Sequence, residues 1–407
     1  MASYWRLLRK SSLRSIFLGV AILGLGYGIV GVLLNLYFLA LGYDSVWIGI
    51  FVAWGFVVAF LTALPISRLV NRLGTRGAIL WGIGLSALSL AAAVLFPSPA
   101  PLLVALALLA MAQEAINIAL GPLLMEQSEP EEREHLFGGQ TAVSTGANAV
   151  GNLVGGWLPA AIALSIGAGE KDPQSYGYTL LMAAALAIVA LLPFSRVPLV
   201  QDHASSLSVL PPESFRIQQI WEDRLLLAFT LPAIVGGLGA GFSIPLLNVY
   251  LDLRYGATSG EIGFIFAWSA AFIALGSLLT GPLARRIGRV PTIVWVQAAS
   301  LPFIAAFALS PNIWWAAGFY WFRAMLMNMA NPIISLLMMD SFNPRRRATV
   351  NAVTGMAWML GSAAASPVAG LLMRHVSLTA PLWITLGLYG LGTYLYYRFF
   401  WRRPLSS

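Results

Sequence analysis

Two ionisable residues lie deep inside long apolar stretches of this 407-residue sequence. Glu114 is enclosed in "AMAQEAINIAL", 12 residues before Glu126, which corresponds to about 18 Å along a helix. A charged carboxylate is costly in apolar surroundings, so a carboxyl group there is suited to taking up and releasing a proton. The alternative is a permanently neutral side chain that is hydrogen-bonded to Gln113, Asn117 or a neighbouring backbone group.

Arg323, in "YWFRAMLMN", is the basic counterpart of Glu114, and it lies 17 residues before Asp340, or about 25 Å along a helix. Two roles follow from its charge. It could pair with Glu114 until a proton or a substrate arrives, or it could bind an anionic group of the substrate. The alternatives are a static ion pair and a side chain that extends outward to polar surroundings.

The elements that carry these residues are expected to span a membrane. Hydrophobic residues make up 58% of the chain and charged residues only 10%, which favours lipid as the solvent. The sequence holds twelve mostly apolar stretches of about the length that a membrane helix needs. They lie at about 16–40, 47–69, 77–96, 101–125, 138–165, 176–195, 225–251, 262–284, 291–310, 313–339, 349–373 and 378–400. Their length, and the lack of alternation, exclude a β-barrel.

The distribution of basic residues predicts the orientation. Most of the 24 Lys and Arg residues fall in alternate connecting segments, and the intervening segments hold only Lys171, Arg254 and Arg374. By the positive-inside rule both termini are cytoplasmic, in a cytoplasmic or inner membrane. The basic start precedes an apolar stretch of full membrane length, so we expect a first spanning helix and no cleaved signal. The net charge of +8 then reflects topology, with membrane lipids as partners and no nucleic acid.

The chain also shows an internal duplication. At an offset of 214, Ile48-Gly49 matches Ile262-Gly263, Arg72 and Gly74 match Arg286 and Gly288, and Glu126 matches Asp340. Upstream the offset is 213 and pairs Asn35 and Tyr37 with Asn248 and Tyr250. We therefore expect two six-helix bundles of the same orientation, at 1–195 and 225–407, joined by a cytoplasmic linker at 196–224. Glu114 and Arg323 then lie on equivalent helices, about 7 Å apart in height.

The duplicated loops carry a family resemblance. "GPLARRIGRV" (281–290) and "SRLVNRLGTR" (67–76) resemble the signature of the major facilitator superfamily in the loop after the second helix of each half. Glu126 with Arg133, and Asp340 with Arg347, resemble its acidic-Pro-Arg pattern after the fourth helix. The resemblance implies an all-α membrane protein of twelve transmembrane helices in two pseudo-symmetric six-helix bundles.

In the family these loops act as a conformational latch. The residues carried over are Arg72, Gly74, Glu126, Arg133, Arg286, Gly288, Asp340 and Arg347. The Asp of the family signature is Asn71 in the first copy and Arg285 in the second. Arg is repelled by a helix N-terminus, so the second latch is expected to act differently, through Arg285 or Arg286 to Asp340. The alternative is a basic turn that serves topology alone.

The resemblance also implies which helices line the substrate cavity. These are the first helix of each half and the fourth and tenth helices of the chain. Together with Arg323, the candidates for substrate contact are Asn35, Tyr37, Gln113, Asn117, Asn248, Tyr250, Asn328 and Asn331. Amides in spanning helices also join helices to one another, which is the alternative for these residues.

The expected function follows from this resemblance. Gly138, Ala147, Gly151, Asn152, Gly155 and Gly156 stand where proton-coupled efflux carriers have Gly-x8-Gly-x3-Gly-Pro-x2-Gly-Gly, with departures at 147 and 152. In this pattern the chain most resembles the drug/proton antiporter-like branch of the family. This implies secondary active transport of a small, partly apolar organic compound by alternating access, as proton-coupled efflux. The alternatives are a proton-coupled uptake symporter and a lipid flippase of the same fold.

A membrane enzyme or receptor is the competing class. The three histidines, His135, His203 and His375, are far apart, and the sequence has no H-E-x-x-H, G-x-S-x-G or Walker A motif. We therefore expect no enzyme activity, no metal and no cofactor. The proton is the expected coupling ion, and the transporter is expected to be a monomer.

Overall fold

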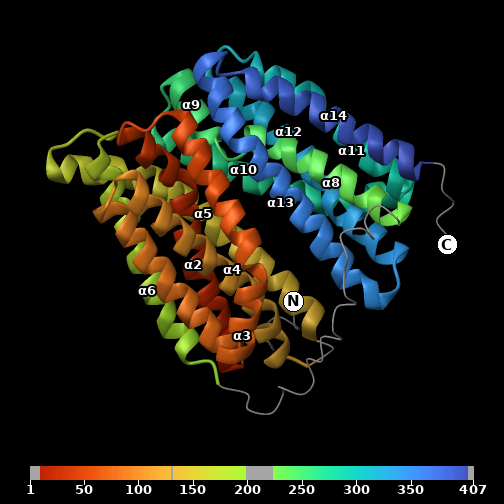
Figure 1. Ribbon diagram of the computed structural model, residues 1–407, viewed down its shortest axis with the longest axis horizontal. Coiled ribbons are helices and arrows are strands. Elements are labelled where there is room, and N and C mark those ends of the chain that lie inside the picture. Colours follow the sequence, from red (N-terminus) through yellow and green to blue (C-terminus); the bar gives the residue numbers. More distant parts are fainter. Residues whose placement is uncertain (1–9, 130–131, 199–222, 402–407) are drawn as a thin grey trace. The chain divides into compact units, whose positions relative to one another are not determined.

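Every regular element in the described part of the chain is a helix. The computed structural model describes residues 10–129, 132–198 and 223–401, and of the expected linker residues 199–222 lie outside that part (Figure 1). The helices are α2 (Ser11–Ala40), α3 (Ser45–Leu95), α4 (Pro99–Glu126), α5 (Arg133–Ile166), α6 (Pro173–Ser195), α8 (Arg224–Ser243), α9 (Leu247–Tyr255), α10 (Ser259–Ile287), α11 (Arg289–Ala308), α12 (Ile313–Ser341), α13 (Pro344–His375) and α14 (Ala380–Phe400).

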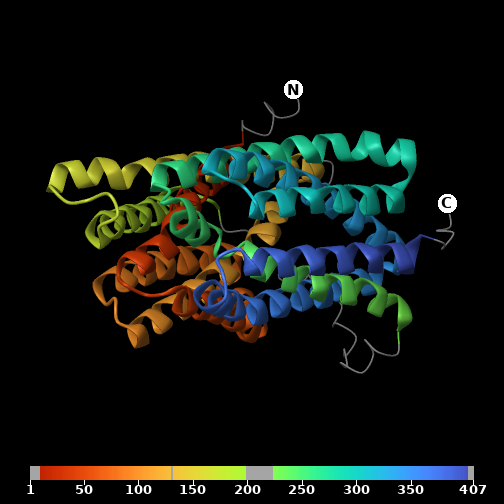
Figure 2. The ribbon, with the colours of Figure 1, turned by 90° about the horizontal axis from the view of Figure 1, so that it is seen from above.

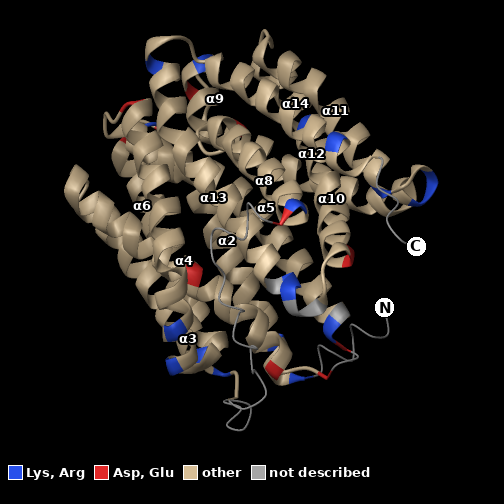
Figure 3. Ribbon diagram, turned by 45° about the vertical axis from the view of Figure 1, so that its right-hand side comes forward, with Lys and Arg blue, Asp and Glu red and all other residues tan. Residues whose placement is uncertain are grey.

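The helix lengths fit a chain that crosses the membrane repeatedly. The described residues include 10 candidate spans, one of which, Arg224–Tyr255, joins α8 and α9. α3 has 51 residues, about 77 Å at 1.5 Å per residue, which is enough for two crossings of a hydrocarbon core of about 30 Å. α14, with 21 residues, is also of spanning length. The expected all-α fold of twelve transmembrane helices is confirmed. Figure 3 shows the charged residues mostly towards the helix ends.

The two signature loops turn through the same backbone conformation. Gly74 interrupts α3 with φ 72° and ψ 164°. Gly288, at the equivalent position of the second copy, separates α10 from α11 with φ 92° and ψ 161°. This region of backbone conformation is essentially restricted to glycine. The repeated glycines therefore end one helix and start the next at the same place in each copy.

The chain divides into two compact units. Unit 1 comprises Met1–Tyr43, Trp54–Leu207 and Thr258–Ala267, and unit 2 comprises Asp44–Ala53, Ser208–Ala257 and Trp268–Ser407. Each unit thus includes a short segment that comes from the other half of the sequence, the first turns of α3 in unit 2 and of α10 in unit 1. The expected domain boundaries at 195 and 225 stay a prediction.

Repeat-related serines hold these exchanged segments. In unit 2, the Ser45 hydroxyl donates to the Gly370 carbonyl at 2.8 Å. In unit 1, the Ser259 hydroxyl donates to the Gly156 carbonyl at 2.7 Å. The offset of 214 relates both serines and both glycines. The duplication is therefore preserved in individual hydrogen bonds as well as in helix order.

Small residues let the first helix of each copy lie close to the fifth. α2 packs against α5 and α6 in unit 1, and α8 packs against α13 and α14 in unit 2 (Figures 1 and 2). A Cβ on Gly24 would lie 2.9 Å from that of Ala147, and one on Gly241 would lie 2.6 Å from the Ser362 carbonyl oxygen. Such contacts exclude larger side chains, as at many helix interfaces in membranes.

Candidate functional site

Arg323 is buried in unit 2, where an aromatic side chain contacts it. Among the residues whose burial is described, it is the only buried charged residue, with 7% of its surface exposed. Its Nη2 donates to the Tyr389 hydroxyl at 2.9 Å, and its guanidinium carbon lies 5.2 Å from the centroid of the same ring. This cation–π contact and the hydrogen bond fix the guanidinium between α12 and α14.

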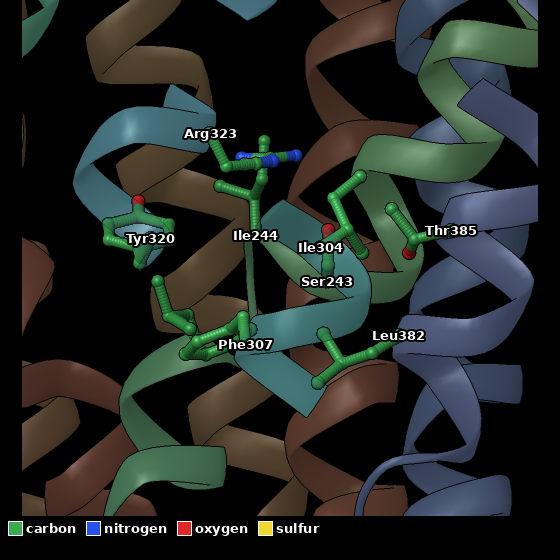
Figure 4. Close-up of a pocket in the computed structure, with 9 residues that line it drawn as sticks. Ser243, Ile244, Ile304, Phe307, Tyr320, Arg323, Leu382 and Thr385 are labelled. Atoms are coloured by element: carbon green, nitrogen blue, oxygen red, sulfur yellow. The ribbon is translucent and has the colours of Figure 1, made fainter. Parts of the chain in front are cut away.

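A small cavity adjoins Arg323 on one side. The space that it lines measures about 310 Å³ including the part that is open to solvent, and most of its lining is apolar. Figure 4 shows Arg323 at one end, and Phe307 and Leu382 at the other. The lining residues are Ser243, Ile244, Leu247, Ile304, Phe307, Tyr320, Arg323, Leu382 and Thr385.

A larger and more polar cavity adjoins Arg323 on another side. It encloses about 1180 Å³ including the space at its open side, and Asn328 and Asn331 line it together with Gln297 and Asn351. Asn331 donates to the Asn328 side-chain oxygen at 3.1 Å, and Asn328 donates to a backbone carbonyl, that of Ala324, at 2.8 Å. One hydrogen-bond donor of each amide is thus engaged within α12. In contrast, the Oε1 atom of Gln297 is buried and has no hydrogen-bond partner among the described residues.

Glu114 lies within α4, in unit 1. It is partly exposed, as is Gln113, whereas Asn117 is exposed. In the described part of the chain the Glu114 carboxyl has no hydrogen-bond or ion-pair partner. Because Glu114 and Arg323 belong to different units, the ion pair between them stays a prediction.

The candidates on the first helix of each half are largely inside their units. Tyr37 and Tyr250 are each 3% exposed and Asn248 is 2% exposed. The Tyr37 hydroxyl donates to the Val94 carbonyl at 3.3 Å, and the Tyr250 ring packs edge-on against another aromatic ring. Neither these residues nor Asn35 are among those that line the two cavities. Their contact with substrate stays a prediction.

The two acidic latch residues, Glu126 and Asp340, make side-chain contacts at equivalent positions in the two copies. The Thr75 hydroxyl donates to Glu126 at 2.7 Å in unit 1, and Arg289 pairs with Asp340 in unit 2. The pairing expected through Arg285 or Arg286 is therefore wrong. Both of these arginines are exposed at the end of α10, whereas Gly288 restarts the helix and places the next residue against α12.

The four latch arginines form two repeat-related pairs, of which one is alike in the two copies and the other differs. Arg72 is exposed, as is its counterpart Arg286. The Nε of Arg347 donates to the Phe342 carbonyl at 3.1 Å. The Nε of Arg133 is buried without a hydrogen-bond partner among the described residues. Their role in conformational change stays a prediction, and residue 130 of the first acidic-Pro-Arg pattern lies outside the described part.

Sequence reasoning missed two ion pairs that the duplication relates. Lys10 pairs with Glu132 at 2.8 Å, and Arg346 pairs with Asp223 at 2.8 Å. Lys10 and Asp223 differ by the upstream offset of 213, and Glu132 and Arg346 by the offset of 214, so the two pairs are equivalent with the charges reversed. The same offsets, applied to charged residues of opposite sign, could have found them.

These pairs shift the ionisation of their members at the helix ends. The hydrogen bond to Glu132 raises the pKa of Lys10, and the same bond lowers the pKa of Glu132. Burial would raise the pKa of Asp223, but hydrogen bonds from the Leu226 N–H and from Arg346 outweigh it and lower that pKa. All three groups are therefore stabilised in their charged forms.

The glycines of the fifth-helix pattern lie in helix contacts. A Cβ on Gly155 would lie 2.7 Å from the Ile29 Cα, and one on Gly156 would lie 2.7 Å from the Ser259 carbonyl oxygen. A Cβ on Gly151 would overlap the Leu25 carbonyl. Close packing thus accounts for these three glycines, although a Cβ on Gly138 would meet nothing within 4 Å.

Comparison with known proteins finds a family match along nearly the whole chain. The family description Major Facilitator Superfamily matches residues 16–255 and 231–407. The "Uncharacterized MFS-type transporter YqjV" of Bacillus subtilis (strain 168) is 24% identical over 173 residues. This match spans 42% of the present chain and 42% of that protein.

Three solved structures share the fold. A bacterial homolog of the human lysosomal transporter Spinster, in an inward-facing and occupied conformation, is 14% identical and has a TM-score of 0.76, with 96% of each chain covered. The nucleoside transporter NupG is 14% identical and has a TM-score of 0.74, over 94% of this chain and 98% of that chain. The xylose transporter XylE from E. coli is 14% identical and has a TM-score of 0.74, over 95% of this chain and 96% of that chain. At such identities the likeness establishes the fold alone.

Proposed function

The chain belongs to the major facilitator superfamily, and we propose that it exports a small, partly apolar organic compound in exchange for protons. Membership makes the protein an integral membrane protein and a secondary transporter that works by alternating access. Proton coupling, direction and substrate class are the proposal. The observation that carries it is the carboxyl group of Glu114.

Glu114 supports the proton as the coupling ion. Its carboxyl group lies well inside a spanning helix and is free of a hydrogen-bond or ion-pair partner in the described part of the chain. An ionised carboxylate is costly at that depth, whereas the neutral acid is tolerated. Water that reaches this site from one side of the membrane at a time would let Glu114 take up a proton on one side and release it on the other.

The larger cavity of unit 2 supports a partly apolar substrate. Ligand sites combine apolar and aromatic walls with a few polar groups that fix orientation. Phe229, Trp358 and Tyr396 supply aromatic surface to this cavity, while Gln297 and Asn351 supply amides. A compound with an apolar body and a small number of hydrogen-bonding groups matches such a lining.

The direction of transport, export, rests on the fifth-helix pattern. The fifth-helix pattern favours the drug/proton antiporter-like branch, but packing accounts for three of its glycines. The distribution of Lys and Arg supports cytoplasmic termini, and we propose that the transporter works as a monomer among membrane lipids, without a cofactor. An uptake symporter and a lipid flippase are the alternatives.

Reconstitution into liposomes with an imposed pH gradient tests the function. For an exchanger, an acidic lumen should drive accumulation of a compound from a chemically diverse panel, because protons leave as the compound enters. Accumulation driven by an acidic exterior would identify a symporter instead. Transfer of labelled phospholipid without compound flux would identify a flippase, and flux that ignores the proton gradient would contradict proton coupling.

A further inference from the structure

We propose that the cavities around Arg323 bind an organic anion with an apolar body and a hydrogen-bond donor close to its acidic group. Arg323 would hold the anionic group, and Gln297 would accept the donor. The inference rests on the proposed function, since it assigns the charge class of the transported compound.

Arg323 is a buried cation without a counter-ion in its own unit. Among the described residues of unit 2, no carboxylate lies within ion-pair distance of it. A guanidinium carries five N–H donors in a planar fork, and the one bond that the structure records for them goes to the Tyr389 hydroxyl. Burial of an unpaired charge is costly, so an anion that enters the site completes it.

The positive charge that lines the two cavities disfavours a cationic ligand. Arg323 lines both cavities, and neither has an Asp or Glu among its described lining residues. A cation entering either space would therefore meet a like charge and no compensating carboxylate. The exposed arginines of unit 2, such as Arg254 and Arg286, line neither cavity.

Gln297 supplies the second recognition element. Its side chain is 4% exposed and lines the larger cavity with Arg323, and its buried Oε1 lacks a partner among the described residues. A buried acceptor without a donor costs free energy, which a hydroxyl or amine on the ligand would recover. Asn328 does not compete for this role, because its oxygen already accepts from Asn331.

The apolar part of the ligand fits the remaining surface. At one end of the small cavity Arg323 is present, and at the other Phe307 and Leu382 close it (Figure 4). This small cavity leaves little room for a ligand group, so the apolar body belongs in the larger cavity, where Phe229, Trp358 and Tyr396 supply aromatic surface. A carboxylate at Arg323, on a short arm next to one aromatic ring, fits this larger space, which encloses about 1180 Å³ including the space at its open side.

Equilibrium binding to the full-length protein in detergent tests the inference with four probes. Mandelate has a carboxylate, a neighbouring hydroxyl and a phenyl ring. Phenylacetate lacks the hydroxyl, mandelamide is the neutral analogue, and 2-amino-1-phenylethanol is the cationic one. We expect saturable binding of mandelate, at least tenfold weaker binding of mandelamide, severalfold weaker binding of phenylacetate and none of the cation.

Variants assign the preference to single residues. Arg323→Gln should weaken mandelate binding at least tenfold and make mandelate and mandelamide equivalent, and Arg323→Lys should retain part of the preference because it keeps the charge. Gln297→Leu should make mandelate and phenylacetate equivalent. Arg254→Gln removes an exposed arginine and should change nothing. A monodisperse elution profile and unchanged melting of each variant separate a lost site from a misfolded protein.

Each result decides for or against the inference. Equal wild-type affinity for mandelate and mandelamide overturns it, as does an anion preference that survives in folded Arg323→Gln protein. Failure of all four probes to bind overturns it too. The assay uses no membrane gradient and leaves Glu114 intact. Anion binding with transport that ignores protons would therefore refute only the proposed function, and proton-driven transport of neutral compounds would refute only this inference.

Discussion

Exchange of charges within the two repeat-related ion pairs should destabilise unit 2 more than unit 1. In unit 1 the exchange is Lys10→Glu with Glu132→Lys, and in unit 2 it is Asp223→Arg with Arg346→Asp. Both pairs have the same separation, 2.8 Å, and their side chains are between 23% and 41% exposed. Ion pairs as exposed as these contribute up to about 1 kcal/mol, and each exchange keeps that attraction.

Helix capping makes the difference between the two exchanges. Asp223 caps α8 through hydrogen bonds from the backbone N–H groups of Leu225, at 2.9 Å, and Leu226, at 3.2 Å. An arginine cannot accept these bonds, and loss of such a cap costs about 0.5 to 2 kcal/mol. Lys10 and Glu132 stand at the N-caps of α2 and α5 without a side-chain bond to their own helices. Glu132 accepts from the exposed Glu129 N–H at 3.2 Å, and Lys10 lies 3.8 Å from the Glu129 carboxylate. Their exchange therefore moves one negative charge from one helix start to another and removes one exposed backbone hydrogen bond.

The exchange in unit 1 should therefore change the free energy of unfolding by less than about 1 kcal/mol, while the exchange in unit 2 should cost about 1 to 2 kcal/mol. Equilibrium unfolding in mixed micelles, with all four single variants to complete both double-mutant cycles, measures these values. Equal stability of the two exchanged proteins would refute the capping argument. A large loss in the unit 1 exchange would refute the equivalence of the two pairs.

Two further perturbations test the first signature loop and the ion pair between Lys10 and Glu132. Gly74→Ala should destabilise the protein by about 1 to 3 kcal/mol, because alanine is strained in the backbone conformation of residue 74. Gly84→Ala, in regular helix, is the control and should be neutral or stabilising. A Cβ at either position meets nothing within 4 Å, so thermal melting of the two variants isolates the effect of backbone conformation. The pKa of Glu132 is lowered in the folded protein. The Glu132 carboxylate therefore contributes its full stabilisation above its unfolded pKa, about 4.3, and this contribution is lost as pH falls through the lower folded pKa. Glu132→Gln protein should lose less stability than wild type between pH 6 and roughly pH 3, and melting temperatures that fall in parallel for the two proteins would contradict this.

The duplication made much of the fold predictable. The offset of 214, found in the sequence alone, predicts that Gly74 and Gly288 adopt equivalent backbone conformations. Their shared region of positive φ is essentially restricted to glycine. Helix lengths follow from apolar stretches in the same way. These features depend on local sequence and on the general thickness of a bilayer, so they can be predicted without knowing any long-range contact.

Side-chain direction and long-range partners were not predictable. Sequence gives the depth of Tyr37, Asn248 and Tyr250 in the membrane, but burial shows that they point into their own units. The partner of Arg323, Tyr389, is 66 residues away on another helix, and no pattern links the two. Local spacing also misassigned the partner of Asp340, because the restart of the helix at residue 288 changes which arginine faces it.

Proton-driven flux in proteoliposomes, compared between wild type and Glu114→Gln, tests proton coupling most directly. In wild type, a pH gradient should drive accumulation of the transported compound above equilibrium, with measurable proton movement in the opposite direction. Glu114→Gln should lose both effects and still exchange labelled for unlabelled compound when no gradient is present. Gradient-driven accumulation that persists in Glu114→Gln protein would contradict the role of this carboxyl group.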